Sequence, residues 1–348
     1  MVAERLQGIA ATAALRLPEP LLLRLAGRER TVRDGKTLDL PTQVLLKMMA
    51  AAGYPPFENL SVQEARAAIA MRSNLLAPRP VAMDRVVDCA VPGPAGDIDV
   101  RIYVPRPEAA GLPVLVYYHG GGWVIGSIET HDAGCRQLAA DADCIVVSVD
   151  YRLAPEHAFP AAVDDALAAF EWVAARAASF GGDSRRIAVG GDSAGGNLSA
   201  VVAQMTRDEG GRQPCFQLLV YPVTDLRCDT RSYDVFAEGF LLTRATMEWF
   251  RAHYLRSQDD RTNPRASPIL AETLEGLAPA GILTAGFDPL LDEGRAYADR
   301  LRETGVEVAY RCYDGLIHGF FSLSGGLLAA RAAARDAASM LREAFAGQ

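Results

Sequence analysis

The chain has no surplus of basic residues. Its 348 residues include 35 Lys and Arg against 43 Asp and Glu, which gives a formal net charge of −8. Because binding to nucleic-acid phosphates requires a basic surface, this balance disfavours a nucleic acid as a partner. Half of the residues are hydrophobic and 22% are charged, which is typical of a globular protein. At this length the chain can form one large α/β domain or two ordinary ones.

A long hydrophobic run is also missing. No uninterrupted apolar stretch approaches the roughly 20 residues that a membrane-spanning helix needs, so we expect no membrane partner. A short apolar piece at 9–17 is preceded by Glu4 and interrupted by Arg16. A cleaved export signal would need an unbroken apolar stretch, so we do not expect one here.

Paired cysteine motifs and metal-ligand spacings are absent as well. The six cysteines are scattered without a C-x-x-C pair, and disulfide frameworks belong to small secreted domains, so we expect reduced thiols in a cytoplasmic protein. The chain contains no H-E-x-x-H motif. A dinucleotide-binding G-x-G-x-x-G is not formed near Gly120 either, because Ile125 stands where the third glycine is required. We therefore expect neither a metal ion nor a cofactor.

From Arg85 onward, apolar runs alternate with helical patterns. Two β-rich runs at 85–91 and 97–104 flank a turn that contains Pro and Gly, which predicts an antiparallel hairpin. Further strands are expected at 114–118, 144–149, 186–189, 216–221, 282–285 and 306–313, and helices at 131–142, 161–178, 195–207 and 327–345. Continuous apolar strands separated by helices are typical of a parallel sheet that is covered on both faces. We predict an α/β fold with a mostly parallel central sheet.

Two segments fall outside this alternation. Residues 1–80 have a helical pattern, including a helix at 41–52 and a capping box at Ser61 and Glu64 that opens another helix. Residues 229–262 form a polar, helix-like insertion. Such segments either pack as simple extensions on the main domain or form a cap over a pocket. We interpret 1–80 as an N-terminal cap segment, 81–348 as the main domain, and 229–262 as a second cap segment.

The most informative motif is G-x-S-x-G at Gly191–Gly195, between a predicted strand and a predicted helix. A serine on such a sharp turn is exposed as a nucleophile, and the two glycines relieve crowding around it. Similar letters at Gly181–Ser184 are followed by two arginines, so we interpret Ser184 as a loop residue that precedes a strand. Asp192 is expected to form a local hydrogen bond, and its sequence context does not make it a proton carrier. Ser193 is the candidate nucleophile.

A serine nucleophile needs a base and an acid. In folds of this kind the order along the chain is Ser, Asp or Glu, then His, which leaves His253 and His318 as candidate bases. His253 belongs to a helical pattern, whereas His318 follows the last predicted strand, so His318 is favoured. Asp288 directly follows the strand at 282–285, while Asp292 falls in the first turn of a helix, where carboxylates commonly cap. We predict Asp288 as the acid.

An oxyanion formed by serine attack needs hydrogen-bond donors. The loop after the strand at 114–118 reads His119–Trp123, with three consecutive glycines. Glycines let bare backbone amides approach a tetrahedral intermediate. We predict that the amides of Gly121, Gly122 and Ala194 form the oxyanion hole.

Five motifs together resemble the hormone-sensitive-lipase-like esterases of the α/β-hydrolase superfamily. They follow the family's order along the chain: His119–Gly122, Asp150–Glu156, Gly191–Asn197, Asp288–Glu293 and His318–Phe320. The resemblance implies an α/β-hydrolase fold with a helical cap and a catalytic domain at 81–348. It also implies a serine carboxylesterase for short to medium acyl chains, with Ser193, Asp288 and His318 as its triad. The segment 151–156 carries no catalytic atom, and we expect Arg152 and Glu156 to hold it in place.

Several alternatives stay open. The same serine and oxyanion hole serve amides, lactones or carbamates, and a non-catalytic ligand receptor can be built on the same fold. A lipase acting at a lipid surface is less favoured, since the N-terminal helices lack a strongly basic amphipathic face. The expected partner is a small-molecule ester, and self-association into a homodimer is left open.

Overall fold

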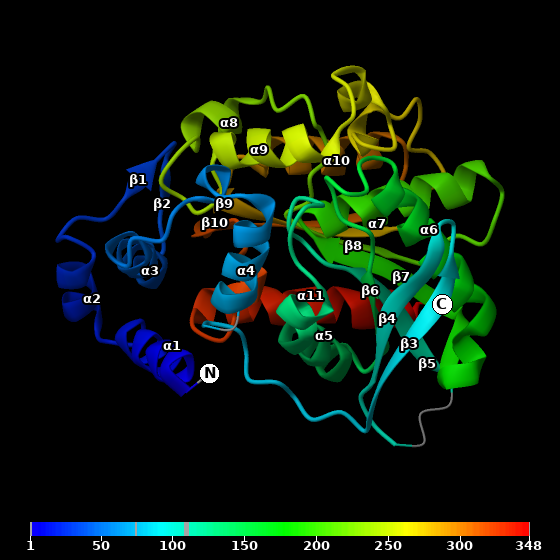
Figure 1. The fold of residues 1–348 in the computed structure, drawn as a ribbon, viewed down its shortest axis with the longest axis horizontal. Coiled ribbons are helices and arrows are strands. Elements are labelled where there is room, and N and C mark those ends of the chain that lie inside the picture. The colour runs from blue at the N-terminus through cyan, green and yellow to red at the C-terminus, as the bar shows by residue number, and fades with distance from the viewer. Residues whose placement is uncertain (1, 74, 108–110, 348) are drawn as a thin grey trace.

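An eight-stranded sheet forms the centre of the computed structural model, which describes residues 2–73, 75–107 and 111–347 (Figure 1). The strand order is β10-β9-β8-β7-β5-β6-β4-β3. The strands are β3 (Arg85–Gly93), β4 (Gly96–Val104), β5 (Leu112–Tyr118), β6 (Ile145–Asp150), β7 (Gly182–Asp192), β8 (Gln217–Val220), β9 (Ala280–Phe287) and β10 (Val308–Ile317). β4 runs antiparallel to both of its neighbours, and the other pairs are parallel. The predicted hairpin and the mostly parallel sheet are confirmed.

Helices cover both faces of this sheet. One layer holds α5 (Ile128–Ala142) and α11 (Leu328–Ala346), and the other holds α6 (Ala161–Arg176), α7 (Ala194–Asp208) and α10 (Leu291–Glu303). Neighbouring residues of β5 enter different cores: Val116 joins Phe170 of α6, and Leu115 joins Leu138 of α5. Every residue of β5 and β9 is buried. Burial on both faces explains why these strands are continuous apolar runs in the sequence.

β7 is longer than its sequence pattern predicted. It begins at Gly182, so Ser184 lies inside the strand, and its assignment to a loop was wrong. The first part of the strand is irregular, because the pairing shifts between Leu112 with Gly182 and Val114 with Ile187. Polar residues occupy this shifted part and hide the strand from an analysis of apolar runs.

The N-terminal segment contains α1 (Val2–Ala14), α2 (Glu19–Leu25), α3 (Leu40–Ala51) and α4 (Val62–Arg72). Ser61 and Glu64 form the predicted capping box at the start of α4. The segment is not entirely helical, however, since β1 (Val32–Arg33) and β2 (Lys36–Thr37) form a small hairpin. Asp34 and Gly35 at its turn have φ values of 51° and 73°. Two positive φ angles are what a tight hairpin turn requires, and Asp-Gly is a favoured pair there.

The insertion at 229–262 folds into α8 (Arg231–Val235) and α9 (Arg244–Tyr254), and it contacts the N-terminal segment. Glu58 accepts hydrogen bonds from the hydroxyls of Thr243 and Thr246, and Arg231 pairs with Asp34. Figure 1 shows α8 and α9 running along the same side of the molecule as the β1–β2 hairpin. Short 3-10 turns occur at Phe57–Asn59, Ala177–Phe180, Asp259–Thr262, Pro268–Leu270 and Phe320–Leu323. Across the described ranges, no helix combines the length and apolarity that a bilayer span requires.

Candidate active site

Ser193 occupies the sharp turn between β7 and α7. Its φ of 56° and ψ of −116° lie in a region that residues other than glycine rarely adopt. A Cβ atom at Gly195 would lie 1.8 Å from the carbonyl oxygen of Tyr118, and one at Gly191 would lie 2.3 Å from the same atom. Both positions therefore need glycine, as the sequence motif predicted. The turn has the strained geometry that exposes a nucleophile at the end of a strand.

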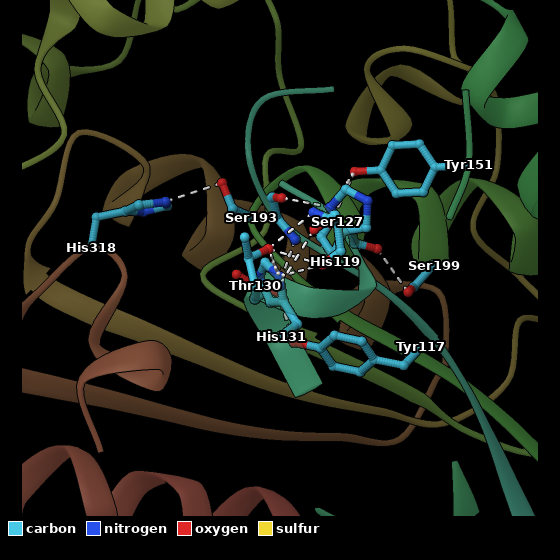
Figure 2. Close-up of polar contacts among 12 residues, drawn as sticks. Tyr117, His119, Ser127, Thr130, His131, Tyr151, Ser193, Ser199 and His318 are labelled. Atoms are coloured by element: carbon cyan, nitrogen blue, oxygen red, sulfur yellow. Dashed lines mark hydrogen bonds and ion pairs between the residues drawn. The ribbon is translucent and has the colours of Figure 1, made fainter. Parts of the chain in front are cut away.

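His318 and Asp288 meet Ser193 at the same end of the sheet. Nε2 of His318 lies 3.0 Å from Oγ of Ser193, and Nδ1 lies 2.8 Å from Oδ2 of Asp288. The other carboxylate oxygen of Asp288 accepts a hydrogen bond from the amide of Leu290 at 2.9 Å, which fixes the carboxylate. Figure 2 shows the imidazole of His318 pointing toward the serine hydroxyl. The structure thus brings the three predicted residues into one hydrogen-bonded line.

The alternative residues lie elsewhere. Asp292 accepts a hydrogen bond from the amide of Ser232 in α8, and Nδ1 of His253 contacts the carbonyl of Trp249 within α9. Asp292 thus anchors part of the insertion to α10. Within the described ranges, neither side chain forms a hydrogen bond with Ser193.

Tyr221 contacts His318, the candidate base, and was missed by the sequence analysis. Its ring centroid lies 4.5 Å from that of His318 and 4.9 Å from that of Phe320. Its φ is 35°, and its amide donates a 2.6 Å hydrogen bond to Leu283 on β9. A tyrosine directly after a buried strand gives no sequence signal that distinguishes it from ordinary core packing.

The glycine loop after β5 lies beside the serine turn. Gly121 and Gly122 have φ values of 121° and 58°, and a Cβ atom at Gly122 would lie 2.2 Å from the ring of Phe250. The amide of Gly120 donates to Asp192 at 2.9 Å. The amides of Gly121, Gly122 and Ala194 have no acceptor among the described residues. Free amides beside a nucleophile can stabilise an oxyanion.

Asp192 belongs to a buried polar network rather than to a local turn, so the expectation of a local hydrogen bond was wrong. Its Oδ1 atom lies 2.7 Å from the hydroxyl of Tyr117 and 3.3 Å from Nε2 of His131. Burial opposes the ionised form, but the charge of His131 and the hydrogen bonds that Asp192 accepts lower its pKa to about 2. The hydroxyl of Tyr151 donates to the carbonyl of His119 at 2.6 Å and extends the network (Figure 2).

The segment 151–156 is held by ion pairs, as its sequence predicted. Arg152 binds Asp165 of α6 at 2.6 Å. Glu156 binds Arg66 of α4 at 2.6 Å, and Arg66 also donates to the carbonyls of Val124 and Ala154. Arg66 therefore connects the N-terminal segment to the loop that follows the three glycines.

Other features of the surface do not compete with this site. A hollow of about 1250 Å³ lies between α1, the linker at 75–80, α5 and α11, and its lining includes none of Ser193, Asp288 and His318. Within the described ranges, no three His, Cys, Asp or Glu side chains are grouped to hold a metal ion. The hydrogen-bonded line of Ser193, His318 and Asp288 therefore identifies the candidate site better than cavity size does.

Comparisons with known proteins agree with this chemistry. Residues 115–322 match the family described as alpha/beta hydrolase fold. The chain is 46% identical over 345 residues to the carboxylic ester hydrolase LipN of Mycobacterium tuberculosis, and the match covers 94% of this chain and 90% of LipN. It is 40% identical over 273 residues to the ethyl acetate hydrolase of Pseudomonas putida, which covers 77% of this chain and 86% of that enzyme.

Solved structures show the same similarity in three dimensions. The ester-hydrolase EH1AB1 from the metagenome of Lake Arreo, complexed with a derivative of bipyridine phosphonate, has a TM-score of 0.86 and 48% sequence identity. That match covers 89% of this chain and 99% of EH1AB1. The Pyrobaculum calidifontis esterase has a TM-score of 0.82 and 42% identity, covering 88% of this chain and 98% of its own.

Proposed function

The chain belongs to the α/β-hydrolase fold family and is a carboxylic ester hydrolase, and we propose that Ser193, Asp288 and His318 are its catalytic triad. The observation that carries this proposal is the line of contacts from Ser193 Oγ through His318 to Asp288, with separations of 3.0 and 2.8 Å. In this arrangement the base can take the serine proton while the acid holds the imidazole and stabilises its charged form.

The proposed reaction is a two-step acyl transfer. Oγ of Ser193 attacks the ester carbonyl as His318 takes its proton, and the resulting oxyanion accepts hydrogen bonds from the amides of Gly121, Gly122 and Ala194. His318 then gives the proton to the departing alcohol as the ester bond breaks, and the acyl group remains attached to Ser193 as an acyl-enzyme. Water, activated by the same imidazole, attacks the acyl-enzyme and releases the acid.

We propose that residues 1–80 and 229–262 form a cap that limits substrate size. Phe250 of the second segment packs against Gly122, and Leu241 lies close to Gly319 beside the base. Apolar side chains so near the reacting atoms favour short to medium acyl chains. A series of p-nitrophenyl esters from C2 to C16 tests this: kcat/KM should fall at long acyl lengths, and a maximum at C16 would contradict it. Matched amide, lactone and carbamate substrates test the scissile bond in the same assay.

The remaining proposals concern partners and location. We propose a small-molecule ester as the substrate partner and a cytoplasmic location, which the six unpaired cysteines support because thiols stay reduced there. Self-association into a homodimer remains a prediction that sedimentation at several protein concentrations tests.

The triad is tested by Ser193→Ala, with Ser184→Ala as a matched control from the similar Gly-Gly-Asp-Ser string. S193A should lose at least about a thousandfold in kcat on p-nitrophenyl butyrate, and S184A should keep nearly all activity. Labelling by an organophosphate should occur in the wild type and in S184A but not in S193A. Near-wild-type hydrolysis by S193A would show that the nucleophile is misassigned. A wild type that neither hydrolyses nor becomes labelled would indicate a ligand receptor.

A further inference from the structure

A histidine outside the triad lies behind the serine turn. His131 is in the first turns of α5, and its Nε2 atom lies 3.3 Å from Oδ1 of Asp192. Only 12% of the His131 side chain and 7% of the Asp192 side chain are exposed. Figure 2 shows His131 close to Thr130, Ser127 and Tyr117. The pair is therefore shielded from solvent and close to the proposed nucleophile.

Both ring nitrogens of His131 face acceptors. Nε2 faces the Asp192 carboxylate, while Nδ1 lies 2.8 Å from Oγ1 of Thr130 and 3.3 Å from the carbonyl of Ser127. The hydroxyl of Thr130 lies 2.9 Å from that same carbonyl and can donate its single proton there. With that proton on the carbonyl, each ring nitrogen of His131 carries its own hydrogen, which is the imidazolium form.

The surrounding groups favour one positive charge on His131. Burial by itself would lower the pKa of His131, but the Asp192 carboxylate outweighs burial and the pKa is raised above its ordinary value. His119, in the glycine loop, has its ring centroid 5.4 Å away. Burial, followed by the charge of His131, lowers the pKa of His119 to about 3, so His119 stays neutral. Tyr117 of β5 donates its hydroxyl to Asp192 and carries no charge of its own.

Asp192 connects the two parts of the oxyanion hole. It directly precedes Ser193 and Ala194 in the chain, and it accepts the amide hydrogen of Gly120, which directly precedes Gly121. A carboxylate at this position without a cation would repel the negative charge that develops on the substrate oxygen. Neutralising this carboxylate is thus a requirement of the chemistry as well as of the fold.

We propose that His131 is a positioning residue that remains protonated through the catalytic cycle and balances the Asp192 charge behind the oxyanion hole. This inference rests on the proposed esterase function. It predicts that the wild-type pH profile has an alkaline limb, because deprotonation of His131 leaves Asp192 uncompensated.

The kinetic test compares the wild type with His131→Gln, with the double variant H131Q/D192N, and with His157→Gln as an exposed-histidine control. H131Q should lower kcat for p-nitrophenyl butyrate about tenfold or more with little change in KM, since an unbalanced charge acts on the transition state. H131Q/D192N removes both charges, so it should recover most of the lost kcat and lack the alkaline limb. H157Q should behave as the wild type.

A structural role alone would not produce that recovery. The inference is wrong if H131Q keeps the wild-type kcat, or if the double variant is no more active than the single one. A wild type without esterase activity would instead refute the proposed function. Nitrogen NMR of imidazole-labelled wild type decides the matter if H131Q fails to fold. The His131 signals are the ones that are missing in H131Q/D192N. In the wild type at pH 7 they should show that both ring nitrogens are protonated, and a neutral tautomer of His131 would overturn the proposal.

Discussion

Asp288 and His318 are 30 residues apart in the sequence, yet Oδ2 of Asp288 lies 2.8 Å from Nδ1 of His318. Asp288 follows β9 and His318 follows β10, and these strands are parallel neighbours. The carboxyl ends of parallel strands meet at one edge of a sheet, where polar side chains can gather. The intervening helix α10 accounts for the spacing in the sequence.

Replacing Asp288 and Asp292 in turn by Asn should show which of the two carboxylates acts as the acid. An amide at position 288 cannot stabilise the imidazolium and favours the wrong tautomer of His318, so D288N should lose about a thousand- to ten-thousandfold in kcat. D292N is the control, because the side-chain oxygen of an amide at position 292 can still accept the hydrogen bond from the backbone of Ser232. Steady-state kinetics on a short ester check both variants. A larger loss for D292N than for D288N would reverse the assignment.

Most of the site could be predicted because the ends of strands and the glycine-containing turn can be recognised from short stretches of sequence. The turn around Ser193 needs glycine where Tyr118 passes within van der Waals distance. Asp288 directly follows a buried apolar strand, and His318 directly follows the last strand. These features follow from backbone sterics and from the order of the strands. The location of each proposed triad residue therefore follows from sequence alone.

Contacts between distant side chains that belong to no recognised motif could not be predicted. Asp192 binds Tyr117 across 75 residues, and Glu58 binds Thr246 across 188. His131 lies on an ordinary amphipathic helix, and nothing in its local sequence indicates a partner on β7. Such pairs depend on how the helices pack onto the sheet, which hydrophobic periodicity does not specify. The Asp34-Gly35 hairpin is different, since its turn pair was a usable signal that the helical interpretation of 1–80 overlooked.

Glycine substitutions should distinguish the strained turn from an ordinary helix. A Cβ atom at Gly195 would lie 1.8 Å from a backbone oxygen that cannot move aside, so G195A should abolish ester hydrolysis and lower the melting temperature. Gly134 lies within α5, and a Cβ atom there meets nothing within 4 Å. G134A should therefore raise the free energy of unfolding by about 0.5–1 kcal/mol. Thermal and denaturant unfolding measure both, and an active, stable G195A protein would contradict the described turn.

Glu293 should make stability depend on pH. It is buried in α10 and accepts the amide hydrogens of Thr224 and Asp225. Burial raises the pKa of this carboxyl well above its ordinary value, although the two amides oppose the rise. Above the ordinary carboxyl pKa, the unfolded chain loses this proton while the folded chain keeps it. The stabilisation is therefore complete below the ordinary pKa and is lost as the pH rises toward the folded value.

Glu293→Gln removes this titration while keeping an acceptor for the two amides. The free energy of unfolding of E293Q relative to the wild type should accordingly increase between pH 5 and pH 8. Urea unfolding at the two pH values measures the difference, and Glu303→Gln, an exposed residue of the same helix, gives the baseline. An equal difference at both pH values would mean that Glu293 is ionised in the folded protein.

Glu58 should control how tightly the two proposed cap segments are held together. Its carboxylate accepts hydrogen bonds from Thr246 at 2.6 Å and Thr243 at 3.3 Å, and Phe57 beside it packs toward Phe250 with ring centroids 6.4 Å apart. Since Phe250 lies against Gly122, loosening this junction should disturb the acyl site more than the triad. We expect E58A to raise KM several-fold for the longest accepted acyl chains, with a smaller effect on acetyl esters and on kcat. The loss of hydrogen bonds to a charged group should also lower the free energy of unfolding by about 1–3 kcal/mol.

Glu248→Ala, which replaces an exposed glutamate of α9, is the matched control, and an acyl-chain series with both variants measures the effect. Glu58 forms hydrogen bonds between the two segments, whereas Glu248 is an exposed residue of only one of them. If E58A and E248A give the same acyl-chain series, the Glu58 contact does not shape the substrate site.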